Sequence, residues 1–478
     1  MNIKLVLRLV GRVMAAESFA LFFPMAVALL YRESPVPFLL SILIILAISL
    51  PLASMRTEKH FFLREGFVSV GLIWLVTGVV GGLPFYFSGY FESFVDCIFE
   101  TCSGFTTTGA TILVDIEALP RGILFWRSFT HWLGGMGVLV LATAVLPSMG
   151  IRSHYLTQAE TPGPVFSKLV PKQSTTSKIL YSIYFGLTVV ETVLLKIAGM
   201  PWYDAVIHAL SSAGTGGFSN RNASVGAYGS VAIDLIITVF ILLFSVNFAV
   251  YFLLLTRKFR DILASDELRF FLLAVALSSV IIFVNILPMY DSAGRALRDT
   301  LFQVASVVST TGFSTADFAL WPTLSQFILV LLMFLGGCAG STAGGLKASR
   351  VLLMIRCAHR SLSRLSHPRV VKVVKLDGKA VDEDTLNTVF VFFTCFFLVL
   401  GGTCLVVSLD GFSLTTSCSA ALACLSNIGP GLEAVGPMGN FAAFSGLSKL
   451  TLSLAMLIGR LEIFPILILL QPATWRRN

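Results

Sequence analysis

The sequence predicts an all-α polytopic membrane protein. Four span–pore helix–span repeats with pseudo-fourfold symmetry surround a central pore, and two extra N-terminal transmembrane helices precede them. Three observations predict this fold. Hydrophobic residues make up 56% of the 478 residues and charged residues only 13%, against roughly 25% charged residues in a soluble domain. Long apolar runs recur along the chain, and four polar tracts containing glycine lie between them. This composition excludes a soluble enzyme and a disordered protein.

Ten apolar runs are long enough to cross a bilayer, which takes about 20 residues. They start near residues 8, 37, 67, 123, 179, 230, 270, 324, 387 and 447. Four shorter apolar stretches lie between the later runs, near residues 92–105, 203–213, 296–308 and 414–425. Because these stretches are too short to span, we expect them to be re-entrant pore helices.

The distribution of Lys and Arg predicts the orientation in the membrane. With the N-terminus inside, most of the 34 basic residues fall in segments on the inner side, as the positive-inside rule requires. Both termini are therefore expected to be cytoplasmic. Topology also explains the formal net charge of +8 without nucleic acid as a partner. The basic segment 350–379 is expected to attract anionic membrane lipid and offers a docking surface for a soluble partner.

The four polar tracts repeat one pattern. They align on a single glycine each, and these glycines are Gly109, Gly217, Gly312 and Gly429. Two residues before the glycine stand Thr107, Thr215, Thr310 and Asn427. Thirteen residues before it stand Asp96, Asp204, Asp299 and Thr416, which are helix N-cap types and are expected to cap the pore helices. The matches indicate a fourfold internal repeat. Since each unit contains two spans, all units share one orientation around an axis along the membrane normal.

This repeat divides the chain into five segments. Residues 1–55 form the two-helix N-terminal extension, followed by pore repeats at residues 56–150, 151–265, 266–380 and 381–478. The third pore repeat contains a segment rich in Gly, Ser and Thr, residues 336–345, which interrupts an otherwise apolar span. From the residues alone, this segment is either a packing kink or a flexible gate. A phosphate-binding loop is disfavoured, because Lys347 stands one residue too late for that motif.

The tracts have the chemistry of a monovalent-cation filter. A ring of backbone carbonyls can replace the water shell of a cation, and glycine allows the positive φ angles that aim successive carbonyls at one axis. The tracts carry no carboxylate and no Lys or Arg, which disfavours divalent cations and anions, and K⁺ fits carbonyl coordination best. The expected K⁺-binding filter residues are Thr107, Thr108, Gly109, Thr215, Gly216, Gly217, Thr310, Thr311, Gly312, Asn427, Ile428 and Gly429.

Arg460 is a basic residue deep within the last span. A charge at the bilayer centre costs about 2.5–3.5 kcal/mol or more, so a purpose is expected. Glu462 lies on another face of the helix and is not an obvious partner. Two interpretations stay open: a structural ion pair with some other group, and a positive charge that faces the cavity and raises the barrier to cations. Asn247, in the second repeat, would either hydrogen-bond to a neighbouring helix or face the pore.

The tracts, the segment 336–345 and the sequence Gly-Arg-Leu-Glu at 459–462 together resemble the Trk/Ktr/HKT superfamily of K⁺ transporters, and most closely its bacterial TrkH branch. The resemblance covers essentially the whole chain. It implies K⁺ uptake across the bacterial inner membrane, with K⁺ as the transported ion and no cofactor in this chain. Glycine, and not serine, at position 109 favours K⁺ over Na⁺ in this family. The resemblance further implies a homodimer and a cytosolic nucleotide-binding regulatory subunit similar to TrkA.

The resemblance also favours the gate among the interpretations above. It implies that the glycine-rich segment gates the pore and that Arg460 faces the cavity. The expected gate residues are Gly336, Gly337, Gly340, Ser341, Thr342, Gly344, Gly345 and Arg460. One alternative is a symporter coupled to H⁺ or Na⁺, for which Glu191 and Glu462 are the candidate carboxylates. A membrane enzyme is the other alternative, disfavoured because no catalytic grouping of Ser, His and Asp stands at a plausible spacing.

Overall fold

The computed structural model describes residues 2–56, 63–137, 173–367 and 372–475. This part of the chain is mostly helical, and its one sheet is a short hairpin of β1 (Lys375–Leu376) and β2 (Lys379–Ala380). The all-α membrane fold predicted from composition is confirmed. The expected boundary between residues 150 and 151 lies outside the described residues, and the division into five segments stays a prediction.

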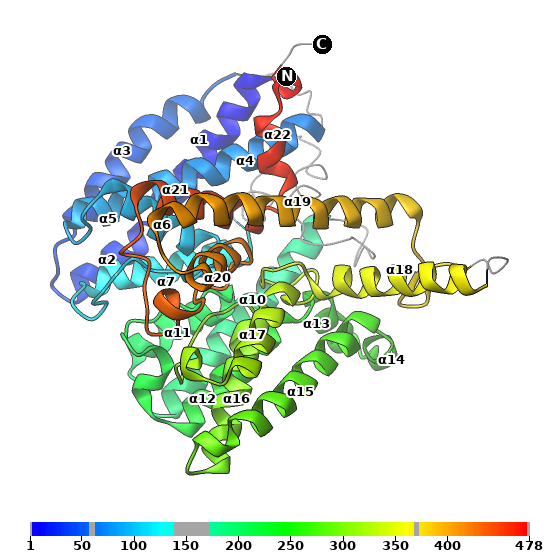
Figure 1. Ribbon diagram of the computed structural model, residues 1–478. Helices are drawn as coiled ribbons and strands as arrows, with labels where there is room; N and C mark the ends of the chain where they lie inside the picture. Colours follow the sequence, from blue (N-terminus) through cyan, green and yellow to red (C-terminus); the bar gives the residue numbers. More distant parts are fainter. Residues whose placement is uncertain (1, 57–62, 138–172, 368–371, 476–478) are drawn as a thin grey trace.

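The helices follow the order that the repeat predicts (Figure 1). The N-terminal extension holds α1 (Ile3–Ala20), α2 (Phe22–Leu30) and α3 (Val36–Ala53). The first pore repeat holds α4 (Leu63–Val80), α5 (Leu83–Ser88), α6 (Phe94–Phe105) and α7 (Arg121–Gly135). The second holds α10 (Gln173–Ile197), α11 (Trp202–Gly214), α12 (Val231–Ser245), α13 (Phe248–Leu255) and α14 (Phe259–Leu263).

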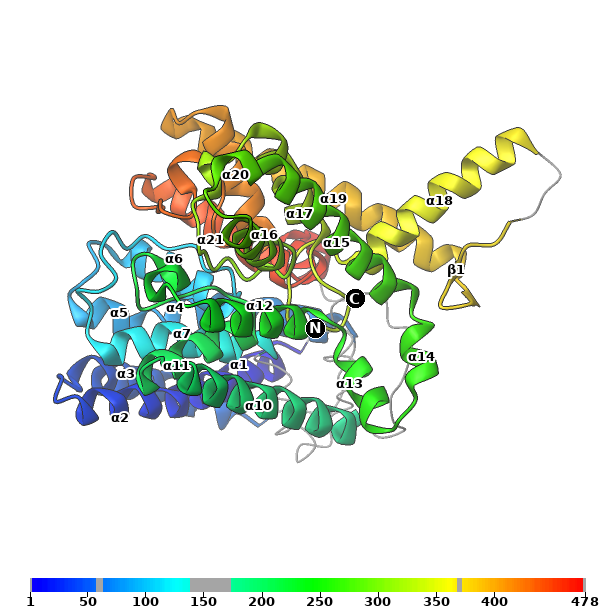
Figure 2. The same cartoon turned by 90° about the horizontal axis from the view of Figure 1, so that it is seen from below.

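The third and fourth repeats continue the series. The third holds α15 (Asp266–Ile286), α16 (Ala293–Val308), α17 (Thr323–Leu335) and α18 (Ala348–Ser366). The fourth holds α19 (Glu383–Val407), α20 (Leu414–Leu425), α21 (Gly446–Arg460) and α22 (Phe464–Leu470). Within the described residues, six 3₁₀ turns lie at Ser224–Tyr228, Leu287–Met289, Phe318–Leu320, Ser408–Asp410, Glu433–Val435 and Pro472–Thr474. Figure 2 shows α18 projecting from the body of the molecule beside the hairpin strand β1.

Six helical segments of the described chain are long and apolar enough to cross a bilayer. They are Ile3–Leu30, Val36–Ala53, Arg64–Ser88, Lys178–Ile197, Asp266–Met289 and Glu383–Asp410. Only 22% of the apolar window is buried in the last three, so their large apolar side chains are placed to face lipid. In contrast, 61% is buried in Arg64–Ser88, which packs inside the protein.

The second span of each repeat, which follows the pore helix, differs from the uninterrupted span that we expected. The helices α7, α17 and α21 contain only 15, 13 and 15 residues, and α12 meets α13 at an angle of 94°. The break after α12 has a clear cause. The last carbonyls of this helix accept hydrogen bonds from the glycine-rich segment: Cys338 N donates to Ser245 O at 2.9 Å, and Thr342 Oγ1 donates to Phe244 O at 3.1 Å. These bonds satisfy carbonyls that a longer helix would use.

The four short stretches form pore helices, as predicted. They are α6, α11, α16 and α20, with bounds within about three residues of the expected ones. The expected capping role of the aligned Asp and Thr residues was wrong. Ser93 and Ser413 cap α6 and α20, and their hydroxyls accept hydrogen bonds from the amides of Asp96 and Thr416, already inside the first turn. Asp299 lies still deeper, because α16 begins earlier, at Ala293.

Candidate functional site

All four pore helices end in the same backbone motif. The residue two positions before the aligned glycine takes the left-handed conformation, with φ of 55–56° in every repeat. The next amide then donates to a carbonyl five residues back, at 2.8–2.9 Å, which is the bonding pattern of a Schellman motif. The left-handed residues are Thr107, Thr215, Thr310 and Asn427. Because glycine normally fills this position, four non-glycine residues there indicate that the surrounding contacts enforce the turn.

The aligned glycines also have positive φ, between 78° and 98°, and they pack against one another's tracts. A Cβ atom on each would strike the carbonyl that precedes the next repeat's glycine. In chain order the glycine and carbonyl residues are Gly109 with Gly216, Gly217 with Thr311, Gly312 with Ile428, and Gly429 with Thr108. The order returns to the first repeat, so the four tracts form one closed ring in which only glycine fits at the contact points.

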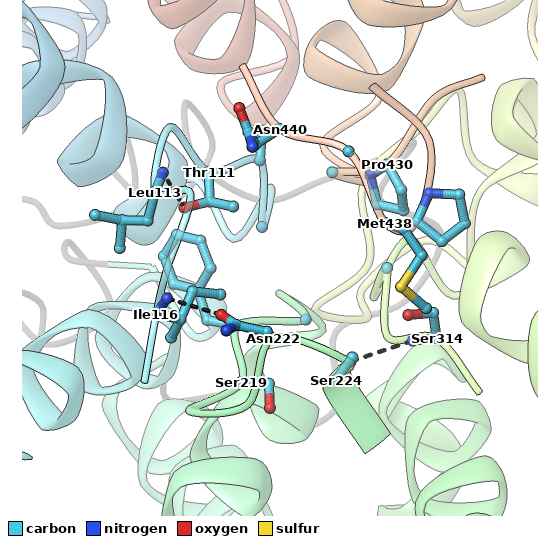
Figure 3. A pocket seen from close by; sticks show the side chains of 18 of the residues that line it. Thr111, Leu113, Ile116, Ser219, Asn222, Ser224, Ser314, Pro430, Met438 and Asn440 are labelled. Carbon is cyan, nitrogen blue, oxygen red and sulfur yellow. Dashed lines mark hydrogen bonds between the residues drawn. The ribbon is translucent and has the colours of Figure 1, made fainter. Parts of the chain in front are cut away.

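A cavity of about 140 Å³ opens onto one side of this ring. All four aligned glycines line it, together with residues from the chain that leaves each tract. Figure 3 shows Thr111, Ser219, Ser314 and Pro430 around this mouth, carried by segments of all four repeats. The cavity therefore lies on the approximate axis of the repeat.

A pore-helix side chain braces the outgoing limb of each tract, by which we mean the residues directly after its glycine. In three repeats this side chain stands nine residues before the glycine, and in the fourth it stands ten before. The hydrogen-bonded pairs are Glu100 with Thr111, His208 with Ser219, Gln303 with Ala316 O, and Ser419 with Leu432 N, at 2.9–3.1 Å. The sequence did not predict these contacts, because the residues nine positions before the glycines are Glu, His, Gln and Ala. These types differ too much to indicate a shared role.

The glycine-rich segment lies against the tracts. Gly344 N donates to Thr310 Oγ1 at 2.6 Å, and Thr215 Oγ1 donates to Thr342 Oγ1 at 3.4 Å. A Cβ on Gly344 would also lie 3.0 Å from that of Asn427. Three of the four left-handed residues thus touch this segment directly.

The other expected gate residues contact one another or a neighbouring helix. Gly336, Gly337 and Gly345 lie where the two limbs of the segment meet, because Gly336 packs against Gly345, and Ala348 N donates to Gly337 O at 3.0 Å. Ser341 Oγ donates to Cys338 O at 2.6 Å within the segment. Gly340 O accepts from Phe248 N at 3.0 Å, at the start of α13.

Arg460 connects the ring to the glycine-rich segment from the end of α21. Its Nη2 donates to Gly134 O and Gly135 O at 2.6 and 2.8 Å, at the end of α7. Its Nη1 donates to Thr342 O at 2.7 Å and to Thr107 Oγ1 at 3.3 Å. Arg460 therefore contacts Thr107, the left-handed residue of the first tract. The other three left-handed residues are the ones that contact the glycine-rich segment.

The neighbouring polar residues have other partners. Glu462 forms an ion pair with Arg350, in agreement with the expectation that it does not face Arg460. Asn247 Oδ1 caps α13 by accepting from Ala249 N at 2.8 Å, a bond within its own helix and not to a neighbouring one. Glu191 is fully buried on α10, which packs against α11, and it does not line the cavity at the ring.

Sequence reasoning missed Glu267, in the first turn of α15. Its side chain is buried, and its Oε1 accepts hydrogen bonds from Ala339 N at 2.7 Å and from Ser349 N at 3.0 Å. One carboxylate thus connects the glycine-rich segment to the first turn of α18. An acidic residue at the start of an apolar run is a common helix N-terminus, so the sequence carries no signal of this longer-range role.

Known proteins with this architecture and sequence are cation transporters. A family model described as "TrkH: Cation transport protein" matches residues 34–476. The "Trk system potassium uptake protein TrkH" of Salmonella typhimurium is 40% identical over 488 residues and covers 100% of both chains. The "Trk system potassium uptake protein TrkG" of Escherichia coli is 34% identical over 485 residues, with 99% of both chains covered. The crystal structure of the potassium transporter TrkH from Vibrio parahaemolyticus matches with a TM-score of 0.88 at 36% identity, over 100% of each chain. The chain therefore belongs to the TrkH family of cation transport proteins.

Proposed function

We propose that this protein takes up K⁺ across the bacterial inner membrane through a pore with a four-part filter of backbone carbonyls. The observation that carries the proposal is the closed ring of glycine–carbonyl contacts, which brings one tract from each repeat to a common constriction. The full-length similarity to proteins named for potassium uptake supports the choice of ion. K⁺ is the transported ion, and we propose neither a cofactor nor an enzymatic reaction.

The ion would shed water where the tracts meet. Carbonyl oxygens of Thr108, Gly216, Thr311 and Ile428 would replace part of its hydration shell. The C-terminal ends of four pore helices point toward this region and add partial negative charge. The membrane potential supplies the driving force, about 2.3 kcal/mol per charge for each 100 mV.

The gate in this proposal consists of the glycine-rich segment and Arg460. The support is their position against the left-handed residues of all four tracts. Outward movement of the segment would exchange its bonds to Thr215 and Thr310 for water and open the path below the ring. Because Arg460 carries a fixed positive charge beside that path, it would raise the barrier to a cation.

The role of Glu267 in this gate gives a testable prediction. Glu267→Ala removes the acceptor that holds Ala339 N and Ser349 N, and hydrogen bonds to a charged group contribute roughly 1.5–3 kcal/mol each. We expect several-fold higher basal K⁺ uptake per folded molecule in proteoliposomes. Glu267→Gln retains an acceptor oxygen and should give an intermediate rate. An Ala variant with the wild-type rate would contradict this role.

The proposed assembly rests on the sequence and on the names of relatives. Both termini would be cytoplasmic, as the Lys and Arg distribution predicts. The relatives' names refer to a Trk system, which supports a multicomponent assembly, and we propose a homodimer that binds a TrkA-like cytosolic nucleotide-binding subunit. The five-segment division of the chain belongs to this proposal.

Reconstitution tests the function. Purified protein in liposomes with a K⁺ diffusion potential should take up radiolabelled Rb⁺, a close K⁺ analogue, and excess K⁺ should compete better than excess Na⁺. The uptake should persist with no Na⁺ present and with a protonophore added. Uptake that stops without a Na⁺ or H⁺ gradient would favour the coupled symporter instead, and no uptake under any of these gradients would contradict K⁺ transport by this chain.

A further inference from the structure

A buried ion pair lies beside the contact between the outgoing limbs of the first and second tracts. We call the contact between the limbs of two neighbouring tracts a seam. Glu100 on the pore helix α6 and Arg127 on α7 are joined by an Oε1–Nε distance of 2.5 Å, and their side chains are 0% and 2% exposed. This is the most deeply buried of the ion pairs in the described part of the chain. Burying two charges is costly unless further hydrogen bonds satisfy both groups, so their remaining partners are informative.

Glu100 holds the outgoing limb of the first tract. Thr111 Oγ1, two residues after Gly109, donates to its two carboxylate oxygens at 2.9 and 3.1 Å. The amide of Ile112 donates to Oε2 at 3.1 Å. The carboxylate is thus fully used by one guanidinium and one short stretch of the tract.

Arg127 holds the outgoing limb of the second tract. Its Nη1 donates to Ser219 O at 3.0 Å. Phe218 directly follows Gly217, and the guanidinium carbon of Arg127 lies 3.7 Å from the centre of its ring. Arg127 also lines the cavity at the ring, where Thr111 and Ser219 lie on neighbouring segments (Figure 3).

Other outgoing limbs contact one another through neutral hydrogen bonds, although ion pairs also join these repeats: Arg298 on α16 with Asp234 on α12, and Lys449 on α21 with Asp96 on α6. Between the second and third repeats, Gly226 N donates to Ser314 O at 3.0 Å, and Ser314 N donates to Ser224 Oγ at 3.3 Å. Between the fourth and first, Phe441 N donates to Thr111 O at 2.8 Å. At the first seam a buried pair of opposite charges contacts both outgoing limbs, and hydrogen bonds nearer the surface, such as that from Ile116 N to Asn222 Oδ1 at 2.8 Å, add to it.

We propose that the Glu100–Arg127 pair is a positioning element of the filter that sets its K⁺ over Na⁺ selectivity. The inference rests on the proposed transport function. The pair fixes the spacing of the first two tracts, and with it the positions of the carbonyls at Thr108 and Gly216, which lie in the closed ring. A filter that selects the larger ion must resist collapse around the smaller one, so looser tracts should admit Na⁺ more readily. Because the two charges cancel, the pair adds no net charge near the ion. Its role is to fix the positions of the two tracts.

The sharpest test changes one hydroxyl and leaves both charges in place. Thr111→Val removes the donor to Glu100 and keeps the side-chain shape, whereas Thr111→Ser keeps the hydroxyl and is the matched control. The readout is the ratio of Rb⁺ to Na⁺ uptake by the full-length protein in liposomes. The Val variant loses the hydroxyl's bonds to Glu100 and the bond that it accepts from Leu113 N. We expect the ratio to fall about threefold in this variant and to be unchanged in the Ser variant.

Two variants of the pair itself extend the test. Glu100→Gln and Arg127→Gln should each lower the ratio about tenfold or more, since breaking a buried pair is strongly unfavourable. Arg127→Lys keeps the charge but not the planar group, and should restore only part of the ratio. If the pair variants do not fold, the Thr111 variants decide. A wild-type ratio in folded Thr111→Val would overturn the proposal. Loss of uptake by the wild-type protein would instead be a failure of the transport function, which the same assay measures separately.

Discussion

Gly109→Ser is expected to reduce K⁺ uptake about tenfold or more. A side chain has no space at this position, and the backbone conformation there is unfavourable for any residue except glycine. Gly109 has φ of 81°, where an L-residue costs roughly 1–2 kcal/mol. Its Cβ would also strike the carbonyl oxygen of Gly216 in the neighbouring tract, and overpacking of this kind costs typically 1–3 kcal/mol. Either the ring opens or Gly216 O turns away, and both outcomes remove a carbonyl from the ion path.

Growth of a K⁺-uptake-deficient strain on low K⁺ measures this effect directly. Wild-type protein should restore growth, and the Gly109→Ser variant should fail at the same level of membrane expression. Gly401→Ser is the matched control, because Gly401 lies within α19 and a Cβ there would meet no atom within 4 Å. Equal rescue by Gly109→Ser and wild type would argue against the filter assignment.

Arg460→Ala is expected to raise K⁺ flux about tenfold or more. A unit charge roughly 8 Å from a passing cation contributes about 2 kcal/mol at an effective dielectric constant near 20, and about 1.4 kcal/mol changes a rate tenfold. The variant also frees Thr342 O and the two carbonyls at the end of α7, which loosens the segment beneath the ring. Both effects act in the same direction.

The loss of charge and the loss of hydrogen bonds can be separated by measuring the flux of a second variant, Arg460→Lys, in single channels or liposomes. Arg460→Lys keeps the positive charge but cannot make all the bonds of the guanidinium group, so its flux should lie between those of wild type and Arg460→Ala. Selectivity for K⁺ over Na⁺ should change little, since the glycine ring is retained. Unchanged flux in Arg460→Ala at normal expression would remove Arg460 from the gate.

The ring could be predicted from the sequence because its determinants are local. The aligned glycines and the polar residues two positions before them stand in the four tracts, and the structure gives both columns the same backbone conformation in every repeat. The pore helices were found for a similar reason, since their length distinguishes them from spans. A misplaced detail, the capping of α6 by Ser93 and not Asp96, shifts the start of a helix by only a few residues.

The rest of the site depends on contacts between segments distant in the chain. The run of apolar residues through 231–255 reads as one span. The groups that end α12, the amide of Cys338 and the hydroxyl of Thr342, stand far along the chain and carry no local signal of the break. Glu267 looks like an ordinary first-turn acid until its bonds to the glycine-rich segment are seen. Glu100 and Arg127 are 27 residues apart, and no periodic pattern links them.

The central claim is that a dehydrated alkali ion sits among main-chain oxygens of all four repeats. The most direct measurement is a crystal structure of the protein grown with Rb⁺ or Tl⁺, with the anomalous scattering used to locate the ion. The account predicts a peak within the ring formed by Gly109, Gly217, Gly312 and Gly429, surrounded by the carbonyls that precede these glycines. Ions bound only elsewhere, by side chains away from the tracts and in protein that transports Rb⁺, would contradict it.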